Sequence, residues 1–477
     1  MKRFFVFLLL VIPSSLVPGQ QRPQPAVKPL VLTNVTVIDA TGAEARTGMA
    51  IIMTNDRITA IGKTSEVKLP NNAQVVDAAG KFLIPGLWDM HTHLLHADFL
   101  RLFIANGVTG IREMGGEWAQ VGFFRNGVKE GKQMGPRIFA AGPYVDGPNP
   151  IWPSSVRVTD QQQGRQIVAK LKQSGVDFIK VYSMLPRDVY LAIADEAKKQ
   201  GIPFVGHVPF SISAAEAVDA GQKSIEHLDM ILRACSDYEE EANKELQDAM
   251  NKPDAIPAVL AVLRSQARKI AETYNEEKAQ SLFAKMAKNG VRICPTLSVQ
   301  RAISMLNDSA FTADPRLKYL PLFITESWNP KNDVRLKGLT ADELAAARET
   351  FGGLLNLVGA MHRAGVEILP GTDTPNPYCF PGFSLHDELA LLVEAGLTPM
   401  EALQAATRNA AKFLGLQDSA GTIEQGKIAN LVLLEADPLA DIANTKKVHA
   451  VITNGKLLDQ AALRKMLAEV EATAGRK

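Results

Sequence analysis

Three observations predict an α/β fold, in which a (β/α)8 or TIM barrel is flanked by a small β-sandwich. First, residues 86–419 of the 477-residue chain alternate between short apolar runs and amphipathic segments with helical spacing. Second, eight such apolar runs occur there, which is the number of strands in a closed parallel barrel. Third, alternating β-branched segments separated by Gly, Asn and Asp turns occur near both ends of the chain.

The first 19 residues are typical of a secretory signal peptide. Residues 2–3 are basic, residues 4–12 are apolar, and residues 13–19 are rich in small and turn-forming types. The apolar run is about half of the roughly 20 residues that a membrane-spanning helix needs. We therefore expect cleavage near Gly19, export to the periplasm or the medium, and no transmembrane segment in the mature chain. An uncleaved membrane anchor is the alternative.

Segments at both ends of the chain predict one composite β-sandwich, built from residues 27–85 and 420–460. Residues 30–39 are alternating and β-branched, and the same pattern returns at residues 429–434. We expect these two parts to pair with each other and to enclose the barrel. Residues 461–477 are predicted to form a C-terminal surface helix.

The central segment, residues 86–419, supplies the strands that the barrel needs. Eight apolar runs are predicted as strands: 87–94, 107–114, 136–142, 177–183, 203–208, 224–229, 291–298 and 366–372. Amphipathic helical patterns separate them, for example at residues 186–200 and 344–362. Residues 235–290 are predicted as a helical insertion after the sixth strand, on the face where loops shape the substrate pocket of a barrel.

Charge and cysteine content narrow the classes of partner. The chain has 52 basic and 51 acidic residues, a net charge of +1, and no basic cluster, so neither nucleic acid nor an anionic membrane surface is expected as a partner. Cys235, Cys294 and Cys379 are widely spaced and odd in number, which gives no disulfide framework. A small-molecule substrate is the expected partner, and the sequence leaves monomer and homo-oligomer open.

Polar residues at the ends of the predicted strands indicate a metal site. His91 and His93 end the first strand, and residues i and i+2 of a strand point to the same face. Four further polar residues lie at strand ends, on the fourth, fifth, sixth and eighth strands: Lys180, His207, His227 and Asp373. Because barrel active sites lie at the carboxyl ends of the strands, we expect these side chains to converge. An isolated HxH pair would also fit ordinary core or surface histidines.

The order HxH, Lys, His, His, Asp on strands one, four, five, six and eight resembles the amidohydrolase superfamily. The chain is most similar to its imidazolonepropionase-like and Xaa-Pro dipeptidase-like, or prolidase-like, branch. Four motifs carry the resemblance: Ile-Lys-Val-Tyr at 179–182, Gly-His-Val-Pro at 206–209, Ile-Glu-His-Leu at 225–228 and Gly-Thr-Asp-Thr at 371–374. The resemblance covers essentially the whole mature chain. It implies hydrolysis of an amide C–N bond in a small carboxylate-bearing substrate, such as a dipeptide or an N-acyl amino acid.

The resemblance also implies two divalent metal ions, with Zn2+ expected and Mn2+, Co2+ or Fe2+ as alternatives. His91, His93 and Asp373 would hold one ion, His207 and His227 the other, and a CO2-derived carbamate on Lys180 would bridge them. Burial and nearby metal charge lower the pKa of a lysine, which favours the neutral amine that reacts with CO2. A hydroxide shared by the ions would attack the carbonyl, with Asp373 as general base and then general acid.

Three alternatives to this binuclear hydrolase stay open. Lys180 could remain an ammonium paired with Glu226, which would leave a one-metal site, while Glu113 is expected to orient ligands. The same scaffold could serve cyclic-amide, lactone or deaminase chemistry. A barrel that had lost catalysis could act as a binding or assembly protein, although none of the ligand positions is missing.

Five residues outside the ligand set are expected to contact the substrate. They lie in loops or at positions that follow strands: Tyr144 and Trp152 after the third strand, Tyr182 after Lys180, Arg233 after the sixth strand and His386 after the eighth. Arg233 is predicted to bind a substrate carboxylate, because a guanidinium group binds carboxylates through two hydrogen bonds. Its alternative is an ordinary surface arginine. His386 is expected near the site by the resemblance, and its alternative is a cap at the start of a helix.

Overall fold

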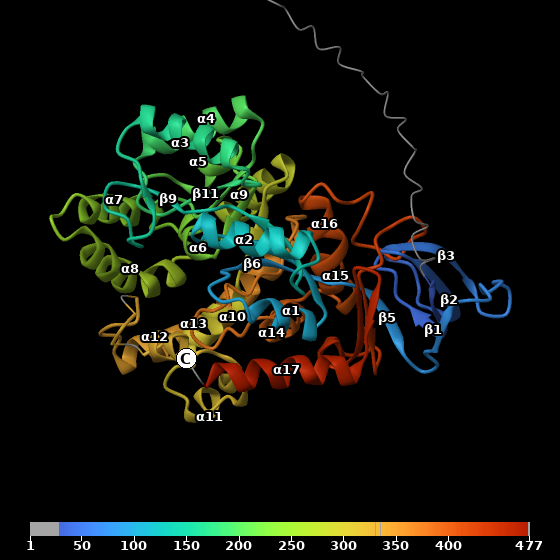
Figure 1. Ribbon diagram of the computed structural model, residues 1–477. Helices are drawn as coiled ribbons and strands as arrows, with labels where there is room; N and C mark the ends of the chain where they lie inside the picture. The colour runs from blue at the N-terminus through green and yellow to red at the C-terminus, as the bar shows by residue number, and fades with distance from the viewer. Residues whose placement is uncertain (1–27, 330, 334, 476–477) are drawn as a thin grey trace, which may run out of the picture.

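The computed structural model is an α/β protein and describes residues 28–329, 331–333 and 335–475. The predicted signal peptide, residues 1–19, lies outside the described residues. Strands from the two ends of the chain, blue and red in Figure 1, stand side by side at one edge, and the helices of the central segment gather beyond them. Within the described ranges, no helix combines the length and the apolar character needed to cross a membrane.

Strands from both ends of the chain form one sheet. The N-terminal strands are β1 (Leu30–Val37), β2 (Arg46–Thr54), β3 (Arg57–Lys63), β4 (Gln74–Asp77) and β5 (Phe82–Pro85). The C-terminal strands are β15 (Leu431–Leu434), β16 (Val448–Thr453) and β17 (Lys456–Leu458). Their order is β17-β16-β15-β5-β1-β2-β3, with β4 paired to β1. The two ends therefore pair directly, through antiparallel β15 and β5, within a single hydrogen-bonded sheet.

The alternation of side chains along β15 explains why all four of its residues are apolar and buried. Leu431 and Leu433 pack in the core of the composite sheet, whereas Val432 and Leu434 pack in the large core of the central segment. Successive residues of a strand point to opposite faces, so a strand covered on both faces reads as a continuous apolar run. This strand fixes the sheet to the body that holds the site.

Short parallel strands fill the central segment, and each predicted strand up to residue 298 contains one of them. They are β6 (Leu87–Thr92), β7 (Val108–Glu113), β8 (Arg137–Ala140), β11 (Ile179–Val181), β12 (Phe204–Gly206), β13 (Ser224–Glu226) and β14 (Arg292–Cys294). Two further strands follow β8, namely β9 (Val145–Asp146) and β10 (Val156–Arg157). The strands form two parallel sheets, β6-β7-β8 and β10-β9-β11-β12-β13-β14.

The expected eighth strand, residues 366–372, is not a regular strand. Isolated parallel bridges join Ile368 to Ile293 of β14 and Thr374 to Thr92 of β6, so the segment lies between the two sheets. The segment is irregular because Pro370 has no N–H to donate and Asp373 has a φ of 54°. On the other side of the sheets, the amide of Asp177, just before β11, donates to the carbonyl of Ala140 in β8 at 2.9 Å.

Helices surround these strands (Figure 1). Before β13 they are α1 (Phe99–Ala105), α2 (Trp118–Lys129), α3 (Gln161–Ser174), α4 (Arg187–Gln200) and α5 (Ala214–Asp219). The insertion after β13 consists of α6 (Asp229–Ala234), α7 (Glu239–Met250), α8 (Ala255–Glu272) and α9 (Glu276–Asn289). The segment from β14 to the last predicted strand contains α10 (Leu297–Ser304), α11 (Ser309–Thr312), η1 (Pro315–Tyr319), α12 (Leu322–Ser327) and α13 (Ala341–Arg363). The remaining helices are α14 (Phe383–Glu394), α15 (Pro399–Gln404), η2 (Ala405–Asn409), α16 (Ala410–Phe413), η3 (Ile442–Lys446) and α17 (Gln460–Ala474).

The helix α4 illustrates why these segments fold as they do. It buries Val189, Ile193 and Ala197, which recur at helical spacing on one face. It ends at Gly201, which has a φ of 64° and occupies the left-handed conformation that closes many helices. The amphipathic pattern predicted for residues 186–200 therefore corresponds to this helix.

Candidate functional site

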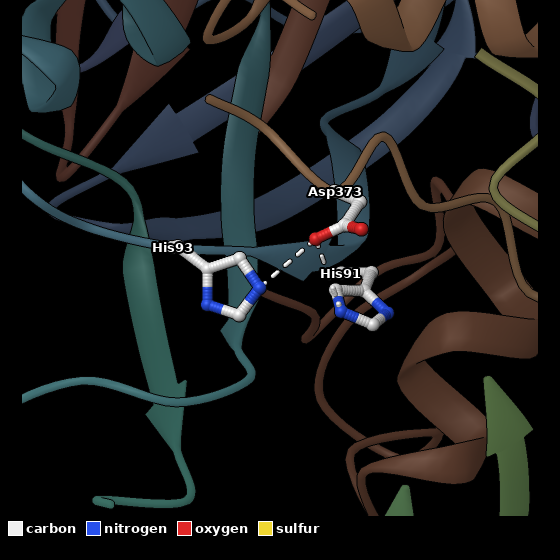
Figure 2. A group of neighbouring side chains, drawn as sticks. All are labelled: His91, His93 and Asp373. Atoms are coloured by element: carbon white, nitrogen blue, oxygen red, sulfur yellow. Dashed lines mark ion pairs between the residues drawn. The ribbon is translucent and has the colours of Figure 1, made fainter. Parts of the chain in front are cut away.

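Histidine side chains meet at Asp373, beyond the carboxyl ends of the parallel strands. Nε2 of His93 lies 2.9 Å from Oδ1 of Asp373, and Nε2 of His91 lies 3.4 Å from the same oxygen. Figure 2 shows both side chains pointing toward this carboxylate. Nε2 of His227 lies 3.9 Å from Oδ2, and the ring centroid of His207 is 4.8 Å from that of His227. One donor atom each of His91, His93 and Asp373 lies within 4.8 Å of the others, close enough to share a metal ion. The fold thus brings together the predicted imidazole and carboxylate ligands.

Each of these histidines uses Nδ1 for a bond on the side away from the cluster. The partners are protein oxygens: Oε2 of Glu226 for His91 at 2.9 Å, the carbonyl of Gly115 for His93 at 3.0 Å, Oγ of Ser183 for His207 at 2.8 Å and Oγ1 of Thr296 for His227 at 2.7 Å. A carbonyl or carboxylate acceptor requires that Nδ1 carries the proton, so the neutral forms of His91 and His93 have their lone pair on Nε2. This arrangement is typical of histidine metal ligands. Burial lowers the pKa of His91 and of His207, which also favours the neutral form.

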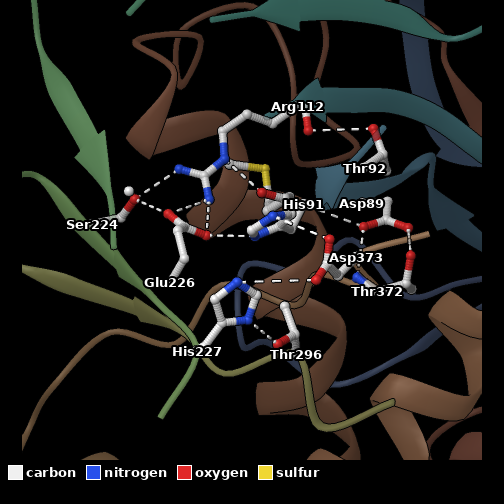
Figure 3. Close-up of polar contacts among 12 residues, drawn as sticks. Asp89, His91, Thr92, Arg112, Ser224, Glu226, His227, Thr296, Thr372 and Asp373 are labelled. Atoms are coloured by element: carbon white, nitrogen blue, oxygen red, sulfur yellow. Dashed lines mark hydrogen bonds and ion pairs between the residues drawn. The ribbon is translucent and has the colours of Figure 1, made fainter. Parts of the chain in front are cut away.

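A buried ion pair holds Glu226 against His91 (Figure 3). Nη2 of Arg112 donates to the two carboxylate oxygens of Glu226 at 2.9 and 2.8 Å, and Oγ of Ser224 donates to Oε1 at 2.5 Å. Arg112 is fully buried, and its guanidinium lies over the ring of Phe413 at 5.2 Å. A buried carboxylate is stable only when its charge is compensated, so Arg112 allows Glu226 to orient the imidazole.

We expect the Glu226→Gln variant to bind divalent metal about 10- to 100-fold more weakly, because partners that orient a ligand contribute to affinity on this scale. Competition with a chromophoric chelator would measure the affinity, on samples that circular dichroism shows to be folded. Glu367→Gln is the matched control, since this carboxylate pairs with Arg292 and Lys412 outside the cluster. Equal affinities of the two variants would show that Glu226 has no orienting role.

Lys180 is a fully buried amine at the same cluster. Among the described residues its Nζ has no hydrogen-bond partner. Burial lowers its pKa to about 8, which leaves about a tenth of such amines neutral at pH 7. The alternative pairing of Lys180 with Glu226 is not among the ion pairs of the described chain, since Glu226 is bound by Arg112. Gly206 of β12 lies close against β11, because a Cβ there would lie 2.2 Å from the carbonyl oxygen of Val181 and 3.1 Å from Cδ of Lys180.

Backbone conformation aims two of the ligands at the cluster. His227 and Asp373 have φ values of 67° and 54°, which non-glycine residues adopt rarely and often at functional sites. Gly371, two residues before Asp373, allows the segment to approach the first ligand. A Cβ at Gly371 would lie 2.6 Å from Cβ of His91 and 2.4 Å from Sγ of Cys294. The irregular eighth segment is therefore what places Asp373 beside His91.

The cluster opens into a cavity of about 860 Å³ with aromatic walls. Tyr144, Trp152 and Tyr182 line it, as do the ligand residues. Nε1 of Trp152 donates to the hydroxyl of Tyr182 at 2.8 Å, and the ring centroid of Tyr182 lies 4.0 Å from that of His207. These three predicted substrate-binding side chains therefore share one cavity with the metal-ligand cluster.

His386 and Arg233 were also expected to contact substrate, but neither side chain lines this cavity. His386 is buried, with Nδ1 bonded to Oγ1 of Thr445 and Nε2 to the carbonyl of Asn106, both at 3.0 Å. Arg233 is buried and donates to Oε1 of Gln266 at 2.7 Å. Both side chains connect helices in the interior. A position after a strand in the sequence does not distinguish such an interior residue from one that lines the cavity.

Glu113 and the loop before α13 add features to the site. Glu113 is buried, its Oε1 accepts the amide of Gly115 at 3.3 Å, and burial raises its pKa to about 7. Because the carbonyl of Gly115 bonds to His93, this carboxylate supports a ligand indirectly.

Three residues that sequence reasoning missed line the cavity: Trp328, Asp333 and Arg335. They lie between α12 and α13, where no strand or helical pattern indicated a place at the site.

Comparisons with known proteins agree with this arrangement. A family model described as "Amidohydrolase family" matches residues 82–458. Ochratoxinase from Aspergillus niger is 26% identical over 415 residues, which cover 79% of this chain and 75% of that protein. The structure of a bottromycin amidohydrolase superposes with a TM-score of 0.72 at 23% identity, covering 95% of this chain and 92% of the other. A putative prolidase from Bifidobacterium longum superposes with a TM-score of 0.64 at 26% identity, covering 94% and 100%. The residues matched by the family model begin in β5 and end in β17.

Proposed function

The chain belongs to the amidohydrolase family and is a hydrolase that acts on carbon–nitrogen bonds, and from this premise we propose a metal-dependent enzyme that cleaves an amide in a small carboxylate-bearing substrate. A dipeptide or an N-acyl amino acid is the proposed substrate class. The observation that carries the proposal is the convergence of imidazole Nε2 atoms on Asp373, together with the buried amine of Lys180, which makes no hydrogen bond within the part of the chain that the structure describes. The resemblance noted from the strand-end motifs is confirmed by the family match.

The donor set fits two divalent ions. His91, His93 and Asp373 would hold the first ion, His207 and His227 the second, and Lys180 would bridge them as a carbamate. The fit rests on this chain's own geometry, since Nε2 of His91, His93 and His227 lies within 3.9 Å of Asp373 and the buried amine of Lys180 has no hydrogen-bond partner among the described residues. When bound, the ions would polarise the scissile carbonyl and acidify a water molecule. Zn2+ is proposed, and the same nitrogen and oxygen donors also accept Mn2+, Co2+ or Fe2+.

The chain's own residues would supply proton transfer and binding. Asp373 is the proposed general base and then general acid, taking a proton at a carboxylate oxygen and passing it to the leaving nitrogen. Tyr182 and Trp152, fixed by their mutual hydrogen bond, would orient the substrate. The aromatic walls would limit the water that surrounds the scissile bond.

We also propose how the domain layout and location serve this reaction. The strand segments of residues 86–419 would close into a (β/α)8 barrel, for which the bridges of Ile368 and Thr374 between the sheets are the support. Residues 27–85 and 420–460 would form the composite β domain, and α17 the end of the chain. The first 19 residues would direct export to the periplasm or the medium, which fractionation of expressing cells would test.

The experiment that tests the function uses the purified chain supplied with Zn2+ or Mn2+. Metal analysis should give close to two equivalents per chain, whereas one equivalent would favour the mononuclear alternative. A mixed library of dipeptides and N-acyl amino acids, read by mass spectrometry, should show cleavage confined to compounds with a free carboxylate near the amide. If the enzyme cleaves only lactones, cyclic amides or amino-substituted heterocycles, the proposed substrate class is wrong and the alternative chemistry takes its place. A chain that binds no metal and turns over nothing would support the binding or assembly alternative.

A further inference from the structure

Besides Lys180, one positively charged side chain of the described residues lines the 860 Å³ cavity. Within the described chain, Lys180 and Arg335 are the lysine and arginine residues that line it. The guanidinium carbon of Arg335 lies 5.4 Å from the ring centroid of Trp152. Arg233, predicted from the sequence to bind a carboxylate, is held elsewhere by Gln266. The cavity therefore has a different arginine available to an anionic substrate.

A neighbouring carboxylate fixes the orientation of Arg335. Nε and Nη2 donate to the two oxygens of Asp333 at 3.0 and 2.6 Å. No hydrogen bond or ion pair to another described residue engages Nη1. A guanidinium has five N–H groups, so the pair with Asp333 leaves both protons of Nη1 and one of Nη2. These protons form the end of the fork, which matches a carboxylate with two hydrogen bonds.

An aromatic wall connects Arg335 with the metal-ligand cluster. Trp152, which faces the guanidinium, donates to the hydroxyl of Tyr182, and the ring of Tyr182 packs on His207 at 4.0 Å. The cavity also contains Asp373. Burial lowers the pKa of Arg335, but its hydrogen bonds to Asp333, with a smaller contribution from the charge of Asp373, outweigh burial and raise the pKa. A substrate lying along this wall would have one end at Arg335 and its amide at the cluster.

We propose that Arg335, oriented by Asp333 and packed on Trp152, binds the carboxylate of the substrate. The inference rests on the proposed amide hydrolysis and names the group that would select carboxylate-bearing substrates. Arg335 would act in binding, with no part in proton transfer. The aromatic walls favour a substrate whose side chain is apolar or aromatic, which guides the choice of probes.

The test compares the metal-loaded full-length enzyme with Arg335→Gln on N-acetyl-L-phenylalanine and on its carboxamide. Losing a charge-assisted hydrogen bond should lower kcat/KM for the acid by about 10- to 100-fold, and kcat/KM for the carboxamide should stay within about threefold. The kcat/KM of Arg335→Lys for the acid should lie between those of wild type and Arg335→Gln. Arg348→Gln is the matched control, because this arginine bonds to Ser304 and Asn307 and does not line the cavity. Equal losses on both compounds, or none, would overturn the proposal.

A binding measurement separates this inference from the proposed function. Calorimetric titration with 3-phenylpropionate and 3-phenylpropionamide needs no turnover. If wild type cleaves neither acyl compound, a Kd for 3-phenylpropionate that rises about tenfold or more in Arg335→Gln would still establish the carboxylate site. In that case the proposed hydrolysis of this substrate class would be wrong, and the carboxylate site at Arg335 would still hold. A Kd that the substitution leaves unchanged would overturn the role of Arg335. So would the absence of any binding of 3-phenylpropionate to wild type at about 10 mM.

Discussion

The Lys180→Ala variant is expected to lose nearly all hydrolytic activity, by about 10² or more, and to regain part of it when acetate or formate is added. The side chain is fully buried at the ligand cluster, and its Nζ lacks a partner in the described chain. As a carbamate, Lys180 would offer neighbouring ions two oxygens that share one negative charge. Alanine leaves a space at this point, which a small carboxylate can enter to supply the same kind of oxygen donors.

Three measurements check the Lys180 prediction. Initial rates with and without 50 to 100 mM formate, taken on metal-loaded protein, give the loss and the rescue, with that range chosen for weak ligands of about 10 mM affinity. Metal analysis should show a fall from the wild-type content. Lys170→Ala, which removes an exposed lysine on α3, should leave both activity and metal content unchanged. Full activity of Lys180→Ala without added carboxylate would show that no bridging carbamate is needed.

The sequence predicted the convergence of the histidines on Asp373 because local patterns determine it. Short apolar runs ending in His91, His207 and His227 identified strands, and a parallel arrangement brings strand ends to one edge. His227 and Asp373 show the limit of that reasoning, since both reach the cluster through positive φ values. The sequence pattern predicted a regular eighth strand, whereas Pro370 and Asp373 make the segment irregular while keeping its position between β14 and β6.

The residues that line the cavity were harder to predict because their positions depend on long-range packing. Arg233 and Arg335 are both arginines outside the parallel strands, and only the folded chain distinguishes them. Gln266 of α8 holds the first in the interior, and Asp333 holds the second in the cavity wall. His386 illustrates the same difficulty, since its partner Thr445 is 59 residues away in the chain. Contacts of this kind leave no periodic signal in the sequence.

The Asp373→Asn variant is expected to lower kcat by about 10² to 10⁴, the range typical of general acid–base catalysis, with a smaller effect on KM. Burial raises the pKa of Asp373, but its contacts with His91 and His93 outweigh burial and hold the pKa below its usual range. Asp373 is therefore anionic at neutral pH and able to accept a proton. Asparagine has nearly the same shape and keeps an oxygen for a metal ion, but it cannot accept and return a proton.

The comparison that isolates proton transfer uses metal-loaded Asp373→Asn and Asp89→Asn. Asp89 is a buried carboxylate that accepts from Oγ1 of Thr372 at 2.7 Å, and burial raises its pKa to about 7. Its substitution should disturb the same segment and lower thermal stability, with kcat within about tenfold of wild type. If Asp373→Asn keeps two equivalents of metal and loses turnover, the loss belongs to proton transfer. If Asp373→Asn has wild-type turnover, another residue must transfer the proton. Glu113, which is buried beside His93 and has a pKa of about 7, would be the next residue to substitute.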